Sequence, residues 1–176
     1  MSPTAPAMSD AASSLFGDPA AIRCERAVAE LRAGRPVVID DGHGQRLAFI
    51  ALDSSTRSSF SAFAQAAADR HYLFLTATRA RVLGVAAEHG ARVPLAGIDF
   101  DALPSLSYRR EPEVMPAGWS AGQALDDGAV EIARLGLLLP AMVGVLLEPA
   151  DHRFDDCAQV SLCDLHQGAE QAAHAY

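Results

Sequence analysis

The stretch AVAELRAGRPVVIDDGHG, residues 27–44, decides the fold because it combines a helix end, a buried strand and an acidic turn. Gly34 can adopt the left-handed conformation that closes a helix, and Pro36 cannot continue one. Residues 37–39 are all β-branched, which is typical of a strand that is covered on both faces. The stretch therefore predicts a helix that ends near Ala33 and a buried strand soon after it.

An acidic turn joins this strand to a second one over residues 46–52. Glycines on both sides of His43 favour a tight turn, so the two strands are predicted to form a hairpin. Asp40, Asp41 and His43 follow the carboxyl end of the first strand, where α/β proteins usually place their functional residues. We therefore take these three as candidate catalytic residues, and Arg46 as a candidate substrate-binding residue.

Helical and strand-like patterns alternate along the rest of the chain. The predicted helices cover residues 18–33, 57–69, 78–84 and 126–138, and a last helix begins near residue 164. The predicted strands cover residues 37–39, 46–52, 71–76, 93–95, 142–147 and 158–162. Residues 99–103 are predicted to form a helical turn, and residues 105–122 a loop of unknown role. The predicted fold class is α/β (α+β), with a three-layer-like mixed sheet flanked by helices.

Composition limits the class of protein. The chain has 176 residues and half of them are apolar, enough for one domain with a sizeable core. Residues 1–17, rich in Ser, Pro and Ala, are predicted to form a disordered tail rather than a signal peptide or membrane anchor, and residues 18–176 a single domain. Three cysteines without a repeated spacing are typical of reduced thiols in a cytoplasmic protein.

Charge excludes several partners. The net charge of −8 argues against nucleic acid and against an anionic membrane, because both need basic patches. All 14 basic residues are Arg. Schiff-base chemistry and Walker-type phosphate loops, which need a Lys, are therefore excluded as well.

Two groups near the carboxyl end contain residue types that bind metals. The first, of the types that bind zinc, consists of His152, Cys157, Cys163 and His166. Its spacing matches no standard zinc finger, so ordinary thiols and surface histidines are the alternative interpretation. The second, at four-residue spacing on one helical face, consists of His166, Glu170 and His174. A solvated helix is the plainer interpretation of that group.

Three other features have two interpretations each. Residues 108–110, Tyr-Arg-Arg, could hold a phosphate or form a solvated basic pair. Trp119 could anchor a partner, but we favour a position in the core. Asp126 and Asp127 could bind a metal, or could cap the helix that follows them.

The segments also occur in the order of a known family. LRAGRPVVIDD (31–41), FSAFAQAAADRHYLFLTATRARVLGV (60–85), GAVEIARLGLLLPAMVGVLLE (128–148) and VSLCDL (160–165) resemble 3,4-dihydroxy-2-butanone 4-phosphate synthase. This riboflavin-pathway enzyme converts ribulose 5-phosphate. The chain resembles still more the divergent synthase-like domain that precedes GTP cyclohydrolase II in some bacteria. The resemblance covers most of residues 20–168 and implies the synthase fold.

The resemblance is weakest at the catalytic motifs. In the family, the two aspartates open a longer loop whose Arg and acidic residues hold two magnesium ions and the sugar phosphate. Here the loop is shorter and has no Glu, so only Asp40 and Asp41 match. The family's Gly-His-Thr-Glu motif falls on residues 124–127, with Leu125 in the place of the His. A Leu can neither bind a metal nor transfer a proton, so the resemblance implies a catalytically degenerate domain.

Three functions follow from these observations. The first is a degenerate synthase-like domain with a structural or regulatory role in riboflavin synthesis and no cofactor. The second is an active lyase whose magnesium is held by Asp40, Asp41, Asp126 and Asp127. The third is a small-anion-binding protein in which His43 and Arg46 contact the ligand.

The resemblance also implies partners. Synthases of this fold are dimers, so a homodimer is expected. The candidate interfaces are apolar, namely the late helix with Leu135, Leu137 and Leu138 or the segment around Phe60 and Phe63. A GTP cyclohydrolase II catalytic domain or another riboflavin-pathway enzyme is a further expected partner.

Overall fold

The structure is a computed structural model that describes residues 15–110 and 114–174, with side chains described up to residue 170. The predicted tail, residues 1–17, therefore lies largely outside the described residues. A seven-stranded sheet forms the centre of the fold, in the order β5-β4-β3-β6-β2-β1-β7. Its strands are β1 (Val37–Asp40), β2 (Arg46–Ala51), β3 (Tyr72–Leu75), β4 (Ala91–Pro94), β5 (Ser120–Ala121), β6 (Ala141–Leu147) and β7 (Ala158–Ser161).

The sheet is mixed, as the sequence predicted. β1 lies parallel to β7 and antiparallel to β2, and the other neighbouring strands pair antiparallel. The predicted hairpin of β1 and β2 is confirmed, with Val37 opposite Phe49 and Asp40 opposite Arg46. The predicted fold class, a mixed sheet with flanking helices, is therefore confirmed.

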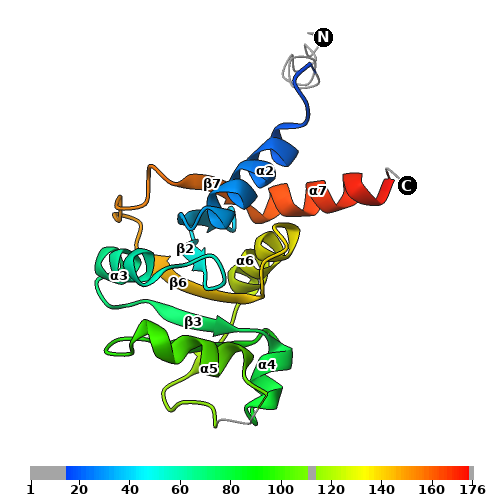
Figure 1. Cartoon of the computed structure of the whole chain (residues 1–176). Helices are drawn as coiled ribbons and strands as arrows, with labels where there is room; N and C mark the ends of the chain where they lie inside the picture. The colour runs from blue at the N-terminus through cyan, green and yellow to red at the C-terminus, as the bar shows by residue number, and fades with distance from the viewer. Residues whose placement is uncertain (1–14, 111–113, 175–176) are drawn as a thin grey trace.

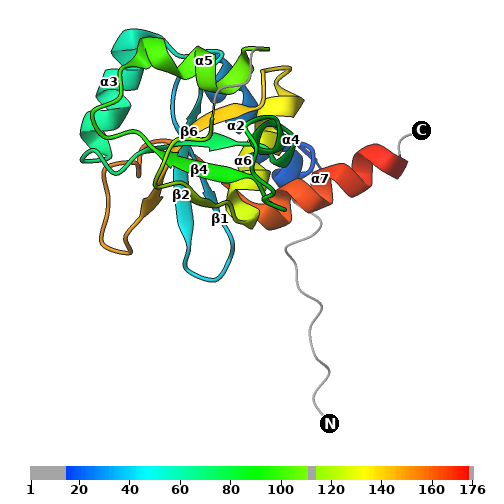
Figure 2. The same ribbon diagram turned by 90° about the horizontal axis from the view of Figure 1, so that it is seen from below.

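Helices cover both faces of the sheet (Figures 1 and 2). They are α2 (Pro19–Arg32), α3 (Arg57–Ala66), α4 (Ala77–Val82), the 3-10 helix η1 (Phe100–Ala102), α5 (Leu103–Tyr108), α6 (Ala124–Leu135) and α7 (Leu162–His174). The core between α2, α6, α7 and one face contains Ile39 and Phe49, and the core on the α3, α4 and α5 side contains Val38 and Ile50. Neighbouring strand residues thus face opposite layers. Within the described part of the chain, every helix is too short or too polar to cross a membrane.

Helix α2 begins and ends as predicted. The Asp18 side chain accepts a hydrogen bond from the Ala21 amide at 3.1 Å, which satisfies an N–H that the first helical turn leaves unpaired. Gly34 has a φ of +77°, and a Cβ there would lie 2.9 Å from the Ser54 carbonyl oxygen. The turn between α2 and β1 therefore requires a residue without a side chain.

Two middle helices differ from their predicted limits. α3 stops at Ala66 rather than Asp69, because Ala68 and Asp69 adopt left-handed φ angles of 51° and 58°. α4 is capped by the Thr76 side chain rather than by the predicted Thr78. Both threonines are suitable cap residues. Because β3 ends at Leu75 and α4 begins at Ala77, Thr76 occupies the cap position.

The predicted loop over residues 105–122 is partly regular, which corrects the prediction. Its first residues complete α5, where Pro104 lies in the first turn and costs no hydrogen bond. Ser120 pairs with Arg92, so β5 adds a short edge strand to the sheet. Trp119 is 36% exposed, so the prediction that it lies in the core is wrong. Segments this short contain too few repeats of a helical or strand-like apolar pattern to be recognised in the sequence.

The two apolar segments predicted as interfaces differ in exposure. Phe60 and Phe63 are 5% and 2% exposed and belong to the core beneath α3, so the prediction of an interface there is wrong. At the carboxyl end of α6, Leu135 and the following Leu137 are 56% and 87% exposed, whereas Leu138 is half-buried. An apolar surface therefore persists at the carboxyl end of α6.

His71, just before β3, is buried without a polar partner for one ring nitrogen. It is 3% exposed, and its ring packs edge-on against Phe60 with centroids 5.5 Å apart. Its Nδ1 makes no hydrogen bond with the described residues. Burial lowers the pKa of His71 from its ordinary value, an effect that the Asp69 carboxylate opposes. The folded protein therefore holds this ring neutral.

We expect the free energy of unfolding to fall as the pH drops below about 6.5, because the unfolded chain then binds a proton that the buried His71 ring resists. His71→Leu removes this titration. The stability of the variant relative to the wild type should therefore rise as the pH is lowered from neutral to mildly acidic. Urea unfolding at several pH values measures this difference, and a difference independent of pH would contradict a neutral buried ring.

Gly90 and Gly97 form a matched pair for testing backbone crowding at β4. Both have a φ of +77°, but a Cβ at Gly90 would lie 2.2 Å from the Leu75 carbonyl oxygen, whereas Gly97 has nothing within 4 Å. Gly97→Ala should cost only the roughly 1–2 kcal/mol of a left-handed Ala. Gly90→Ala should cost several times more or prevent folding. Thermal melts compare the two, and equal losses would show that the contact with Leu75 is unimportant.

Candidate functional site

The predicted site residues lie at one end of the sheet. The pairing of Asp40 with Arg46 and Ser161, and of Arg46 with Leu147, places the carboxyl ends of β1, β6 and β7 beside the start of β2. The start of β3 lies at the same end, because Tyr72 pairs with Gly144 of β6. The hairpin turn therefore borders the end of the sheet at which β1, β6 and β7 have their carboxyl ends.

The acidic turn uses its own carboxylates to hold its backbone. The Asp40 side chain accepts a hydrogen bond from the Gly42 amide at 3.0 Å. One Asp41 oxygen accepts from the amides of His43 and Gln45, at 2.8 and 3.1 Å. The His43 amide in particular lowers the pKa of Asp41. Both candidate carboxylates therefore have a structural role in the turn, and His43 itself is exposed.

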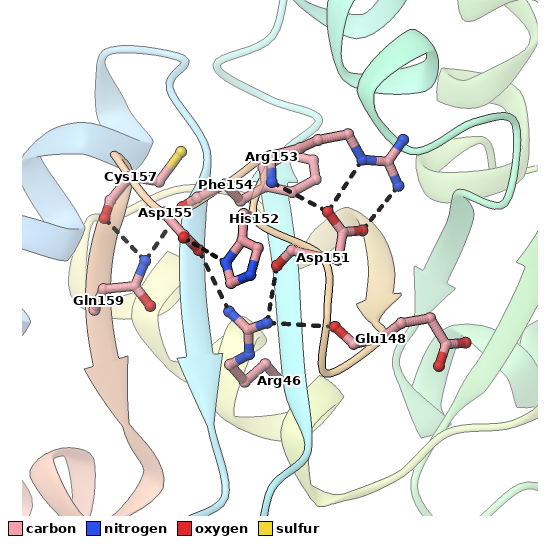
Figure 3. A network of polar contacts seen from close by, with 9 residues as sticks. All are labelled: Arg46, Glu148, Asp151, His152, Arg153, Phe154, Asp155, Cys157 and Gln159. Carbon is pink, nitrogen blue, oxygen red and sulfur yellow. Dashed lines mark hydrogen bonds and ion pairs between the residues drawn. The ribbon is translucent and has the colours of Figure 1, made fainter.

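Arg46, the candidate substrate-binding residue, binds the loop of residues 148–157 instead of pointing to open solvent (Figure 3). Its Nη2 donates to the carbonyl oxygens of Asp151 at 3.0 Å and Glu148 at 3.4 Å. Its Nη1 lies 3.8 Å from a carboxylate oxygen of Asp155. This loop connects β6 to the parallel strand β7, so Arg46 stabilises a crossover connection.

The same loop carries its own ion pairs (Figure 3). The Arg153 guanidinium binds both oxygens of Asp151, at 3.0 and 2.8 Å, and lowers the pKa of that carboxyl to about 2. His152 Nδ1 lies 2.8 Å from Asp155. Cys157 is half-buried, and burial raises the pKa of its thiol. The loop is therefore held by its own ion pairs, and of the candidate zinc ligands only His152 takes part in them.

The predicted metal ligands do not form a cluster. Among the residues that the structure describes, no group of three or more His, Cys, Asp or Glu side chains could hold a metal ion. Neither the predicted zinc group nor the four aspartates of the lyase hypothesis is therefore brought together. The predicted group with Glu170 includes His174, whose side chain lies outside the described residues.

A buried polar network anchors the beginning of α6. Asp126 is 1% exposed, and its carboxylate accepts hydrogen bonds from the Tyr72 hydroxyl at 2.6 Å, from Arg92 Nε at 2.8 Å and from the Gln123 amide at 2.9 Å. Arg92 Nη2 also lies 2.7 Å from it. The guanidinium packs over the Tyr72 ring, 4.9 Å from its centroid. Burial, with the Asp126 charge, raises the pKa of the Tyr72 hydroxyl, which therefore stays neutral.

This network corrects the predicted role of Asp126. The residue that caps α6 is Gln123, and Asp126 is the third residue of the helix, whose side chain returns to the Gln123 amide. Asp127 points elsewhere and lies 3.0 Å from His89 Nδ1, where both side chains are about half exposed. Leu125 is 2% exposed and packs in the core with the sheet.

A cavity of about 280 Å³ adjoins this network, lined among others by Arg70, Tyr72, Arg92 and Glu148. Its basic side chains already have acidic partners. Arg92 binds Asp126, and Arg70 lies 3.6 Å from Glu148. Because these charges are compensated, the cavity offers no excess positive charge to an anion.

Sequence reasoning missed Tyr72 and Arg92. The available signal was a single Arg within the short apolar strand Ala91–Pro94, because a buried Arg requires an acidic partner. The partner could not be identified, since Asp126 lies far along the chain. For residues 108–110, the structure buries the Tyr108 hydroxyl without a described partner and leaves both arginines exposed. Phosphate binding there stays a prediction.

Comparisons with known proteins give one close sequence relation. No protein-family model matches the chain. The chain is 50% identical over 159 residues to GTP cyclohydrolase-2 from Xylella fastidiosa strain Temecula1 / ATCC 700964, and equally to that of strain 9a5c. Each match covers 90% of this chain but 40% of the relative, so the chain spans less than half the length of these curated relatives.

Solved structures of 3,4-dihydroxy-2-butanone 4-phosphate synthase share the fold. One crystal structure in complex with two magnesium ions matches with a TM-score of 0.56 at 14% identity, over 82% of this chain and 95% of that one. A two-domain synthase from A. baumannii matches with a TM-score of 0.53 at 15% identity, over 86% and 54%. The chain therefore has the synthase fold that the resemblance implied. Its described residues do not fit a magnesium site of this kind, because no group of potential ligands converges.

Arg92→Ala tests the network at α6. Removing the guanidinium leaves the Asp126 charge buried without a cationic partner, so we expect a loss of about 3–5 kcal/mol in the free energy of unfolding. The control is Arg57→Ala, since Arg57 pairs with Asp99 and Asp101 in exposed positions. It should cost little, because exposed ion pairs are screened by solvent. Urea unfolding compares the two variants, and similar losses would contradict the structural role of Arg92.

Proposed function

We propose that this domain accompanies riboflavin synthesis as a structural or regulatory unit and does not carry out the synthase reaction. Two findings support a relation to that pathway. The fold is that of 3,4-dihydroxy-2-butanone 4-phosphate synthase. The sequence is half identical to a part of GTP cyclohydrolase-2. Two features support the lack of catalysis, namely the beginning of α6 and the hairpin turn between β1 and β2.

The beginning of α6 is the main observation behind the loss of catalysis. The position that the resemblance aligns with the family's His is Leu125, which is buried among apolar side chains. The next residue, Asp126, directs its carboxylate inward to Arg92 and Tyr72. A general acid or base needs a polar group that is free to exchange a proton with the substrate. Leu125 has no such group, and the Asp126 carboxylate is paired inside the core. This segment therefore serves packing and charge compensation.

The hairpin turn supports the same conclusion. A magnesium site needs several oxygen ligands that converge on one point. The turn supplies only Asp40 and Asp41, and both accept hydrogen bonds from its own amides. Arg46, which could have held a phosphate, is bound to the loop after β6. The described residues therefore offer neither a preformed magnesium site for a lyase nor a free basic side chain at Arg46 for an anion. The degenerate domain requires neither.

The proposed partner is a GTP cyclohydrolase II catalytic domain or another enzyme of the pathway. The chain matches less than half of each curated cyclohydrolase relative. In those proteins, the part that resembles this chain is therefore joined to a longer part that does not match it. A domain without chemistry of its own can still orient or stabilise such a remainder. We propose this role for the present chain.

We expect no formation of 3,4-dihydroxy-2-butanone 4-phosphate from ribulose 5-phosphate, with or without magnesium. The reason is the buried Leu125 and, among the residues that the structure describes, the absence of a cluster of acidic ligands. The assay detects the product chromatographically, beside an active synthase as a positive control and a heat-killed sample as a negative one. Added magnesium should also leave the thermal melt unchanged, because no group of potential ligands converges in the described part of the chain.

The outcome against this proposal is equally concrete. Turnover above the heat-killed sample that Asp41→Ala abolishes would favour the magnesium-dependent lyase. Asp53→Ala is a suitable matched control, because that carboxylate accepts a hydrogen bond from the Leu139 amide and is not among the candidate residues. Equal activity in both variants would point to a contaminating enzyme.

A further inference from the structure

A cavity of about 380 Å³ lies on the α3 side of the sheet. It is formed by α3, the turn before β3 and the segment that follows β4, and none of the candidate site residues lines it. Its volume falls within the range of sites for small molecules. Its polar lining residues are Ser61, Gln65, Asp69, His71 and Asp99.

The His71 ring faces this cavity and has an unused nitrogen. The Leu95 amide donates to the His71 carbonyl at 3.1 Å, so the pairing of β3 with β4 continues to His71. Because strand residues alternate between faces, His71 points to the α3 side with Leu73, whereas Tyr72 points to the other side. Its ring packs on Phe60, which also lines the cavity. The ring is 3% exposed, and its Nδ1 makes no hydrogen bond with the described residues.

The other polar side chains of the cavity also have unused acceptors. Ser61 and Gln65 lie four residues apart on one face of α3, and Asp69 lies in the turn after it. The side chains of these three make no hydrogen bond or ion pair with the described residues. Asp99 has only an exposed contact of 3.3 Å with Arg57 Nη1. The cavity is therefore rich in acceptors that await a donor.

The charge around the cavity is negative. Asp69 and Asp99 are the charged residues of the lining. The neighbouring basic residues are used elsewhere, since Arg57 Nη2 binds both carboxylate oxygens of Asp101 at 2.6 and 2.5 Å. Arg70, the residue after Asp69, pairs with two acidic residues after β6. A ligand of this cavity is therefore expected to carry a positive charge.

The acceptors suit an organic cation better than a metal ion. No group of three or more His, Cys, Asp or Glu side chains among the described residues could hold a metal, although Asp69, His71 and Asp99 line one cavity. An organic ammonium ion is larger and donates its own N–H groups, so it can reach acceptors that do not converge on one point. Phe60 and Ile98 add an apolar wall that an alkyl chain can cover.

We propose that this cavity binds a small organic amine, as a primary ammonium ion on a short alkyl chain. The ammonium group donates to the carboxylates of Asp69 and Asp99 and to Nδ1 of the neutral His71 ring. The alkyl chain packs against Phe60 and Ile98. The chain has no Lys, so the ammonium group comes from another molecule. This inference goes beyond the proposed function and does not depend on it.

An NMR titration of the isotope-labelled protein with n-butylammonium tests the site. The amide signals of residues 61–71 and 95–99 should shift and reach saturation. Butyltrimethylammonium has the same charge and alkyl chain but no N–H group, so it should bind about tenfold more weakly. 1-Butanol has the alkyl chain without the charge, and it should cause no saturable shift.

Single variants locate the binding groups. Asp69→Asn removes a charge, and Asn tolerates the left-handed φ of 58° at this position. His71→Leu removes the ring nitrogen and should fold, because it replaces an unpaired buried polar group by an apolar one. Each should weaken n-butylammonium binding about fivefold or more. Glu88→Gln is the matched control, because Glu88 is exposed and precedes β4, whereas the cavity lies after that strand.

General attraction of cations by an acidic protein is the result that would overturn the site. The chain carries a net charge of −8, so such attraction is expected to be similar for both cations and for all carboxylates. Equal binding of the two cations, or equal weakening by Asp69→Asn and Glu88→Gln, would identify it. Shifts that rise linearly, or that occur outside the two segments, would also reject the proposal. Turnover plays no part in the titration, so the site can fail while the proposed loss of catalysis holds.

Discussion

The buried carboxylate of Asp126 is the group on which one end of this fold depends. A charge that is 1% exposed destabilises a protein unless it is paired and fully hydrogen-bonded. Arg92 and Tyr72 supply partners from β4 and β3, and the Gln123 amide supplies one from the start of α6. The network therefore joins the helix to two strands that lie far from it in sequence. It also completes the cap of α6, so the helix start and the sheet stabilise each other.

This requirement limits what the end of the sheet can do chemically. An aspartate that must stay paired with a buried arginine is not available to bind a metal ion or to transfer a proton. The hairpin turn is restricted in the same way, because the Asp41 carboxylate accepts two amides of its own turn. Arg46 is likewise bound to the crossover loop after β6. The polar side chains of Asp41, Arg46 and Asp126 therefore all bind the protein's own backbone and side chains.

Much of the fold could be predicted from local patterns, whereas the contacts of the site could not. Asp18 and Gly34 mark the limits of α2, and the β-branched run after Pro36 marks β1, because capping and strand preferences act over a few residues. The segments around Phe60 and Leu135 are both rich in apolar residues. Phe60 nevertheless lies in the core and Leu135 on the surface. The difference depends on which other element packs against each segment, and the local sequence does not contain this information. Arg92 was missed for the same reason. Its partner, Asp126, is brought near only by the pairing of the complete sheet.

A titration with Mn²⁺ followed by NMR tests most directly whether this end of the sheet keeps a metal site. Mn²⁺ occupies magnesium sites and broadens the amide signals of the residues around it. With ribulose 5-phosphate present, we predict that the amides of residues 40–43 and 123–127 broaden no more than those of the exposed Asp99 and Asp101. Strong broadening confined to the first two segments, and lost in Asp41→Ala, would contradict the account.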